Sequence, residues 1–96
     1  MTEIKSGKNE FFMEENGEII ARIQFTSNGK RENEKEVIEV NHTIVNEGYN
    51  GRGLAKQLVH KIADYARKEK KLIVPVCSYA KKVLESNEEY QDILAK

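Results

Sequence analysis

Apolar residues recur at every second position early in the chain, which is the pattern of a strand with one buried face. The alternating residues are Ile19, Ala21, Ile23 and Phe25. A shorter apolar segment, Phe11-Phe12-Met13, precedes them, and Glu14-Glu15-Asn16-Gly17 joins the two. Because an Asn-Gly pair strongly favours a tight turn, the pattern predicts a β-hairpin over residues 10–25.

A second alternating segment spans residues 37–45. One face carries Ile38, Val40, His42 and Ile44, and the other carries Val37, Glu39, Asn41, Thr43 and Val45. His42 is therefore expected to point into the core or a cavity wall. The linking residues 27–36 begin with the turn-like Ser27-Asn28-Gly29-Lys30, and they are interpreted as a charged loop or a strand with its ends in water. The first half is thus predicted to be an antiparallel meander of about three strands.

The second half has helical periodicity followed by a buried strand. The residues at helical spacing are Leu54, Ala55, Leu58, Val59, Ile62, Ala63 and Ala66. The continuous apolar run at residues 72–77 is typical of a central parallel strand that is buried on both faces. Pro75 lies inside this run and lacks a ladder donor, so the strand is expected to leave its neighbour there. With short helices after residue 78, the pattern predicts an α+β fold in which a meander leads into a βαβ unit.

Composition narrows the class of protein. The length of 96 residues suits one domain, residues 1–96. Sixteen acidic residues balance sixteen basic ones, which argues against nucleic-acid and anionic-membrane partners. Two histidines and one cysteine make a poor zinc site, and no metal is expected. A polar start and the lack of a long apolar run make the cytoplasm the expected location.

The stretch Tyr49-Asn50-Gly51-Arg52-Gly53 leads directly into the predicted helix. The first turn of a helix presents unpaired amides and partial positive charge, and glycines let an anion approach closely. A phosphate is the expected ligand. The loop that binds nucleotide triphosphates needs Lys-Ser/Thr where this chain has Leu54-Ala55, so that reading fails. The dinucleotide fingerprint needs a third glycine where Lys56 stands, and it fits poorly too.

The same stretch resembles motif A of the GNAT acetyltransferases, Arg/Gln-x-x-Gly-x-Gly/Ala. Gly53 and Ala55 match its last two defined positions, whereas Asn50 replaces the first. The segments HTIV (42–45) and PVCSYAKKVLESNEEY (75–90) resemble a small, truncated GNAT-like subfamily with a Pro-x-Cys-x-Tyr motif.

The resemblance implies that acetyl-CoA is bound, with its diphosphate on the glycine loop and its pantetheine arm between strands 37–45 and 72–77. The residues that it assigns to the cofactor are Val45, Asn50, Gly51, Arg52, Gly53, Leu54 and Ala55. The alternative is that the glycines only form a tight turn and Pro75 only ends strand pairing.

Three residues are candidates for chemistry. Cys77 stands at the C-terminal end of the last predicted strand and precedes a helix that Ser78 could cap, a position that would raise its thiolate fraction and allow acetyl transfer. Direct attack by an amine would instead use a base and an acid, for which His42 and Tyr79 are the candidates. Each of the three could also be structural, and His60 is expected at the surface.

The sequence therefore predicts an acetyl-CoA-dependent acetyltransferase, with a non-catalytic acyl-CoA-binding module or a partner-docking protein as the alternative. Full-size GNAT enzymes carry additional N-terminal helices and a C-terminal hairpin around the acceptor site. Since 96 residues do not accommodate them, an open acceptor site is expected, suited to a bulky acceptor such as a macromolecule. The acceptor itself stays unidentified.

Overall fold

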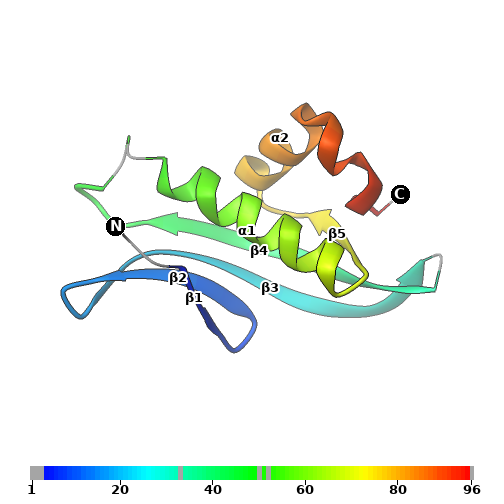
Figure 1. Cartoon of the computed structure of the whole chain (residues 1–96), viewed down its shortest axis with the longest axis horizontal. Helices are drawn as coiled ribbons and strands as arrows, with labels where there is room; N and C mark the ends of the chain where they lie inside the picture. The colour runs from blue at the N-terminus through cyan, green and yellow to red at the C-terminus, as the bar shows by residue number, and fades with distance from the viewer. Residues whose placement is uncertain (1–3, 33, 50, 52, 96) are drawn as a thin grey trace.

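The computed structural model describes residues 4–32, 34–49, 51 and 53–95 and has an α+β architecture (Figure 1). Within these residues, five strands form one sheet in the order β1-β2-β3-β4-β5. The strands are β1 (Ile4–Gly7), β2 (Glu10–Glu15), β3 (Glu18–Glu32), β4 (Lys35–Val45) and β5 (Lys71–Pro75). The helices are α1 (Leu54–Lys68), α2 (Ser78–Ser86) and the 3-10 helix η1 (Glu88–Ile93). Among the strands of the described residues, β4 and β5 are the one pair that runs in parallel, so the predicted meander and βαβ unit are confirmed.

The meander has four strands, one more than expected. β1 was not predicted because Ile4 is its only large apolar residue and its other side chains are exposed. The turn at Asn16-Gly17 is confirmed, since both residues adopt positive φ, 53° and 79°. The turn expected at residues 27–30 is wrong, because β3 continues through it to Glu32, so of the two interpretations of this segment the strand is correct. Gly29 (φ 76°) instead lies in an irregular stretch where the pairing of β3 with β4 shifts between Ser27 and Arg31.

A bulge in β4 overturns the predicted facing of His42. Gln24 of β3 pairs with His42, yet the next residue, Phe25, pairs with Val40, so Asn41 is an extra residue in β4. An extra residue displaces the alternation of side chains beyond it. His42 and Ile44 are consequently exposed, whereas Ile38 and Val40 are buried. The expectation that all four share a buried face is therefore wrong.

β5 is an edge strand, which corrects the prediction of a central strand. It is last in the sheet order, and Leu72 and Ile73 are its only buried residues. The C-terminal segment partly covers its outer edge: Leu94 forms a bridge with Ile73, and the amide of Ala95 donates to the Ile73 carbonyl at 2.9 Å.

Pro75 does not itself part β5 from β4. The amide of Val76 donates to the Val40 carbonyl at 3.0 Å, and successive amides of a strand point to opposite sides. The nitrogen of Pro75 therefore faces the outer edge, where a missing donor costs no bond to β4. The bulge at Asn41 lies directly after Val40, the last β4 residue that pairs with β5, and accounts better for the separation.

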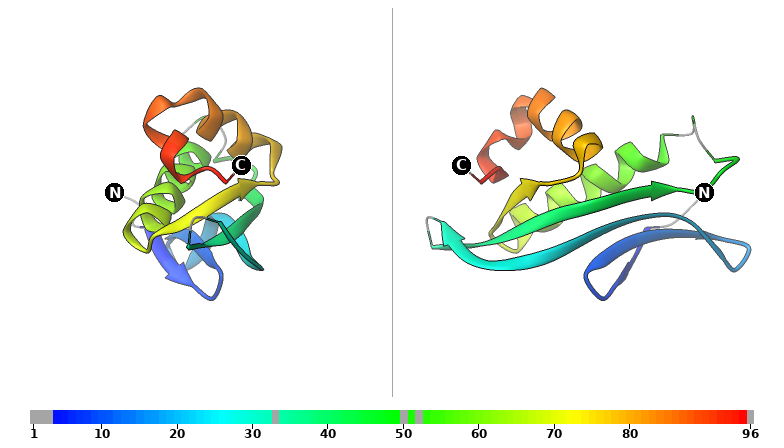
Figure 2. Two further views of the ribbon diagram at one scale, coloured as in Figure 1. Left: turned by 90° about the vertical axis from the view of Figure 1, so that its right-hand side faces the viewer. Right: turned by 180° about the vertical axis from the view of Figure 1, so that it is seen from behind.

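All the helices pack on one face of the sheet (Figures 1 and 2). α1 contacts β2, β3, β4 and β5, and α2 contacts α1, β4 and β5. The buried face of α1 consists of Leu54, Leu58, Val59, Ile62, Ala63 and Ala66, as its helical spacing predicts. The opposite face of the sheet carries no helix among the described residues. Within the same residues, no helix has the length and apolar character needed to cross a bilayer.

Candidate functional site

A tethered turn carries the chain from β4 to α1. The amide of Asn46 donates to the Ile20 carbonyl at 2.8 Å, and its side-chain amide donates to the Ile19 carbonyl at 2.8 Å. The amide of Tyr49 then donates to the Asn46 carbonyl at 3.1 Å, and the Tyr49 ring packs against the core. These contacts fix where the glycine loop begins relative to the sheet.

The start of α1 offers uncapped amide donors to an anion. Gly53 is the N-cap residue, makes no side-chain cap hydrogen bond, and has a φ of 74°. The first intrahelical hydrogen bond runs from the Gln57 amide to the Gly53 carbonyl at 3.1 Å, and no acidic residue occupies the first turn. The amides ahead of Gln57 therefore lack intrahelical partners, and a negative charge is favoured beside them.

The space before this helix terminus is open. A Cβ atom built on Gly51 or Gly53 would meet no atom within 4 Å, although both residues adopt positive φ (85° and 74°). The glycines thus serve the backbone conformation and leave room for a group that approaches the amides. This arrangement fits a diphosphate.

A pocket of about 320 Å³ lies at the same place. Its lining comes from the end of β4, the loop and the starts of α1 and α2, namely Val45, Tyr49, Gly51, Gly53, Leu54, Ala55 and Tyr79. Five of the seven residues that the sequence assigned to the cofactor are among them. The other two, Asn50 and Arg52, lie outside the described residues.

The parallel strands separate next to this pocket. Their pairing ends at Val40 and Pro75, and the Val40 carbonyl accepts the amides of both Val76 (3.0 Å) and Cys77 (2.9 Å). Beyond that point β4 continues to Val45, whereas the other chain turns into α2. The expected divergence of the two strands is therefore confirmed, with the bulge at Asn41 marking its start.

Cys77 lies in this gap. Its sulfur lies 3.6 Å from the hydroxyl oxygen of Thr43. Cys77, rather than the expected Ser78, is the N-cap residue of α2. Burial raises the pKa of the Cys77 thiol, but the Ala80 amide, the Thr43 hydroxyl and the Tyr79 amide favour the thiolate, so the net pKa is below its ordinary value.

The structure separates the three candidates for chemistry. Tyr79 lines the pocket and is 40% exposed. Thr43 of β4 contacts Cys77 at the start of α2. His42, one residue before Thr43, is exposed on the opposite face of the sheet. The histidine and the thiol therefore approach the gap from different sides.

His60 is not the surface residue that the sequence predicts. It is half-buried on α1, and its Nδ1 is hydrogen-bonded to the hydroxyl of Tyr90, a buried residue of η1. Since this pair lies in the packing between α1 and η1, it contributes to stability away from the gap.

Sequence reasoning missed residues that position the site. Asn46 tethers the loop, Tyr49 supports it from the core, and Thr43 contacts the thiol. Of these three, only Thr43 lies in a segment whose alternation predicted a strand. The side to which its side chain points depends on the bulge at Asn41, and a bulge cannot be recognised from the spacing of apolar residues.

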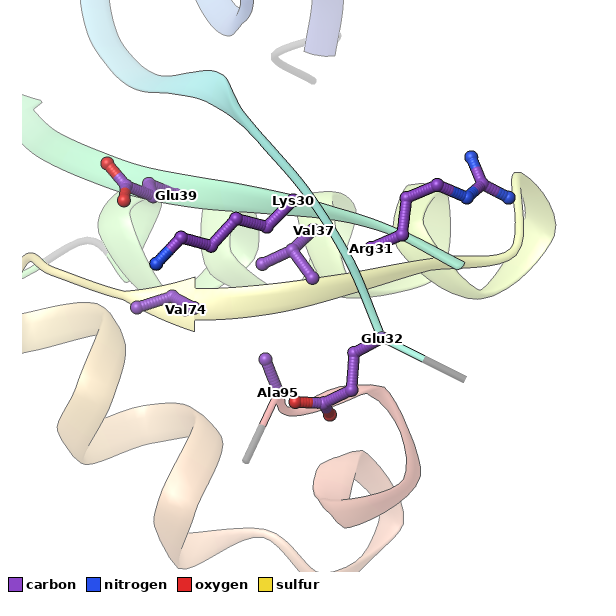
Figure 3. A pocket seen from close by; sticks show the side chains of 7 residues that line it. All are labelled: Lys30, Arg31, Glu32, Val37, Glu39, Val74 and Ala95. Carbon is purple, nitrogen blue, oxygen red and sulfur yellow. The ribbon is translucent and has the colours of Figure 1, made fainter. Parts of the chain in front are cut away.

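A further pocket, of about 290 Å³, lies on the opposite face of the sheet (Figure 3). The end of β3 passes across β4 and β5 there, with α1 behind them. Its lining residues are Lys30, Arg31, Glu32, Val37, Glu39, Val74 and Ala95. It shares no residue with the loop pocket, and its mixed charges favour no particular ligand.

A family model described as GCN5-related N-acetyl-transferase matches residues 10–93. The chain belongs to the GCN5-related N-acetyltransferase family. This match establishes the family, and the narrower grouping by the Pro-x-Cys-x-Tyr motif stays a prediction. No curated protein sequence matches the chain.

Solved structures of this family share the fold. A GCN5-like protein from Staphylococcus aureus, solved by NMR, is 30% identical with a TM-score of 0.75, over 97% of this chain and 87% of its own. The ribosomal-protein-alanine N-acetyltransferase of Brucella melitensis is 21% identical with a TM-score of 0.62, over 91% of this chain and 63% of its own. A predicted acetyltransferase from Clostridium acetobutylicum, crystallised with acetyl-CoA, is 20% identical with a TM-score of 0.60, over 80% and 54%. The chain spans less than two thirds of the length of the last two.

Proposed function

We propose that this chain is an acetyltransferase that takes its acetyl group from acetyl-CoA. The observation that carries the proposal is the adjacency of three features in a member of this family: an uncapped helix start, an open pocket and a strand gap with a thiol. A diphosphate, a pantetheine arm and a thioester need these features in that order. Residues 1–96 would act as one domain.

The proposed diphosphate site is the glycine loop and the first turn of α1. The amides of Gly53, Leu54 and Ala55 would hold the phosphoryl oxygens, and Gly51 would keep the approach open. Asn50 occupies the first position of the family motif in place of Arg or Gln, and Arg52, two residues on, would supply a permanent positive charge in compensation. Val45 would contact the arm, since it lies on β4 two residues beyond Thr43 and lines the pocket.

Acetyl-CoA supplies an activated acetyl group, and Cys77 is the proposed acceptor within this chain. The Cys77 thiolate would form a bond to the acetyl carbonyl carbon as the bond to the CoA sulfur breaks, and the released sulfur takes up a proton. An acceptor amine would then take the acetyl group from Cys77, lose its proton and restore the thiol. The lowered pKa of Cys77 supports this route.

Direct transfer to an amine is the second route. Tyr79 lines the pocket and could donate a proton to the departing sulfur. His42 could accept the amine proton only if the acceptor approaches the gap from the helix-free face, where this side chain is exposed. That face carries no helix among the described residues, which suits a macromolecular acceptor.

A non-catalytic acyl-CoA-binding module is the alternative, and one observation favours it. The described lining of the loop pocket contains no carboxylate and no imidazole, and His42 is exposed on the other face of the sheet, so no general base lies beside the pocket itself. Such a module would bind the same ligand and leave it intact.

An NMR titration with CoA tests binding. The amides of Gly53, Leu54 and Ala55 should shift most, while those of β1 stay unchanged. Intact-mass and peptide analysis after incubation with acetyl-CoA then tests chemistry, with one acetyl group expected on Cys77 and none on Cys77→Ser. Turnover with an amine panel that survives in Cys77→Ser but fails in His42→Gln would assign direct transfer. Binding without any acetylation would assign the module, and unshifted loop amides would reject all three.

A further inference from the structure

A second hollow adjoins the loop pocket on the side of α2. It has a volume of about 330 Å³, and its lining residues are Lys56, Tyr79, Lys82, Val83, Ser86 and Asn87. Tyr79 lines both hollows, so they adjoin at this ring. A ligand that is seated at the start of α1 can therefore extend into the second hollow without leaving the protein surface.

Helical geometry places these side chains together. Tyr79, Lys82, Val83 and Ser86 are spaced i, i+3, i+4 and i+7 along α2, which puts them on one face. Lys56 lies in the first turn of α1, two residues beyond Leu54 of the loop pocket. The hollow thus lies between the start of α1 and one face of α2, which it follows to Asn87, the residue after the helix.

The charged side chains that line this hollow are all positive. Lys56 and Lys82 contribute two ammonium groups, and no carboxylate is among the lining residues. Both lysines are exposed, and neither takes part in an ion pair with another described residue. Since the chain as a whole has zero net charge, this local excess of positive charge favours an anionic group.

The walls between the lysines suit an aromatic base. The ring of Tyr79 is 40% exposed, and Val83 is half-buried beside it. The side-chain amide of Asn87 donates to the Val83 carbonyl at 3.0 Å, which leaves its oxygen available as an acceptor. A planar group with amino substituents and a nearby phosphate would satisfy this set of contacts.

We propose that Lys56 and Lys82 bind the 3′-phosphate of the CoA nucleotide, and that this site distinguishes CoA from 3′-dephospho-CoA. The inference rests on the proposed function, because the diphosphate must lie at the start of α1. With the thioester arm directed to the Cys77 gap, the nucleotide would leave the diphosphate toward the second hollow, which adjoins the loop pocket at Tyr79 and carries the two lysines. A phosphate dianion there meets two ammonium groups that have no described protein partner.

The test compares two ligands and four proteins by isothermal titration at low salt. For the unmodified chain we expect CoA to bind about tenfold more tightly than 3′-dephospho-CoA, as two exposed ion pairs would give. The double variant Lys56→Gln, Lys82→Gln should bind the two ligands equally, at the affinity of 3′-dephospho-CoA. Lys81→Gln is the matched control, since Lys81 is an exposed lysine of α2 that does not line the hollow. The single variant Lys82→Gln should lose part of the preference.

The outcomes separate the two proposals. Equal affinity of the unmodified chain for both ligands would overturn the lysine site while leaving CoA binding in place, and that measurement does not depend on any variant folding. A double variant that weakens both ligands by the same factor would also overturn it. If neither ligand binds the unmodified chain, the proposed function fails and the lysine site fails with it.

Discussion

The sulfur of Cys77 lies 3.6 Å from the hydroxyl oxygen of Thr43, across the gap where β4 and β5 have stopped pairing. The contact joins the start of α2 to a strand that has just passed a bulge at Asn41. Without that extra residue, the two strands could continue their parallel ladder through this region. The bulge and the thiol are therefore parts of one local arrangement.

The thiol of Cys77 should react at lower pH than an ordinary cysteine, because the Ala80 amide and the Thr43 hydroxyl outweigh burial and lower its pKa. The rate of alkylation by iodoacetamide, followed by mass against pH, should have its midpoint below that of the same chain unfolded in urea. Since the chain has one cysteine, the unfolded protein is its own reference. Thr43→Val should move the midpoint upward, and Thr26→Val should not. A folded midpoint at or above the unfolded one would contradict the lowered pKa.

The lowered pKa of Cys77 also makes the stability of the fold depend on pH. A thiol whose pKa is depressed in the folded state contributes stability above its unfolded pKa, and this contribution is lost as pH falls through the folded pKa. The contribution is therefore present at alkaline pH and absent in acid. Cys77→Ser should remove this dependence without altering the fold.

Much of the fold could be predicted from periodicity. The helix from Leu54 and the hairpin turn at Asn16-Gly17 follow from local patterns that the packing then reinforces. β1 could not be predicted, because its side chains are mostly exposed and it is held by pairing with β2, a contact with no hydrophobic signature. The sequence left residues 27–36 open as a charged loop or a strand, because the charged end of β3 forms a strand through pairing with β4 and has no apolar pattern of its own.

Only part of the candidate site could be predicted from the sequence. The glycine loop has a spacing that reflects backbone chemistry, so the sequence predicted an anion site there, and Gly51 and Gly53 of that loop line the pocket. The facing of His42 could not be predicted, because one bulged residue reverses the alternation and the sequence around Asn41 contains no glycine or proline to mark it. The role of Pro75 was misread, because the direction of its missing amide depends on the register with β4.

Gly53→Ala should weaken CoA binding more than its cost in stability accounts for. Gly53 has a φ of 74°, so an alanine there should cost about 1 kcal/mol in folding free energy. Its Cβ would also project into the open space at the helix start. Gly48→Ala is the matched control, since Gly48 has a φ of 93°, equally free surroundings and no place in the pocket lining. Thermal unfolding and CoA titration of both variants should give similar stabilities and a weaker affinity only for Gly53→Ala. Equal affinities would remove Gly53 from the diphosphate site.

Tyr90 should make the fold sensitive to strongly alkaline pH. Burial, followed by the nearby carboxylates of Glu89 and Asp64, raises the pKa of Tyr90 to about 12. A pKa raised in the folded state gives stability that is present below pH 10 and lost as pH rises toward 12, amounting to about 2–3 kcal/mol. The urea-derived free energy of unfolding should fall less steeply over this interval in Tyr90→Phe than in the unmodified chain.

Tyr90→Phe also removes the hydrogen bond to His60, which should cost about 1 kcal/mol at neutral pH. The relevant readout is therefore the slope of the free energy of unfolding against pH, and not its value at one pH. Tyr79→Phe, at an exposed position, should leave the free energy of unfolding at neutral pH unchanged. An identical slope in Tyr90→Phe and the unmodified chain would show that the hydroxyl of Tyr90 ionises normally.

Deleting Asn41 should close the gap while preserving the fold. Val40 and Thr43 would keep their faces, because the bulge adds one residue to an otherwise regular alternation, and the ladder between β4 and β5 could then extend toward Cys77. Asn41→Ala is the control: it keeps the bulge and loses only the 3.0 Å hydrogen bond to the Thr26 hydroxyl, worth about 1 kcal/mol. Both variants should melt cooperatively, yet only the deletion should lose affinity for CoA and the low alkylation midpoint of Cys77. Retention of both properties in the folded deletion variant would mean that the start of α2 alone holds the strands apart.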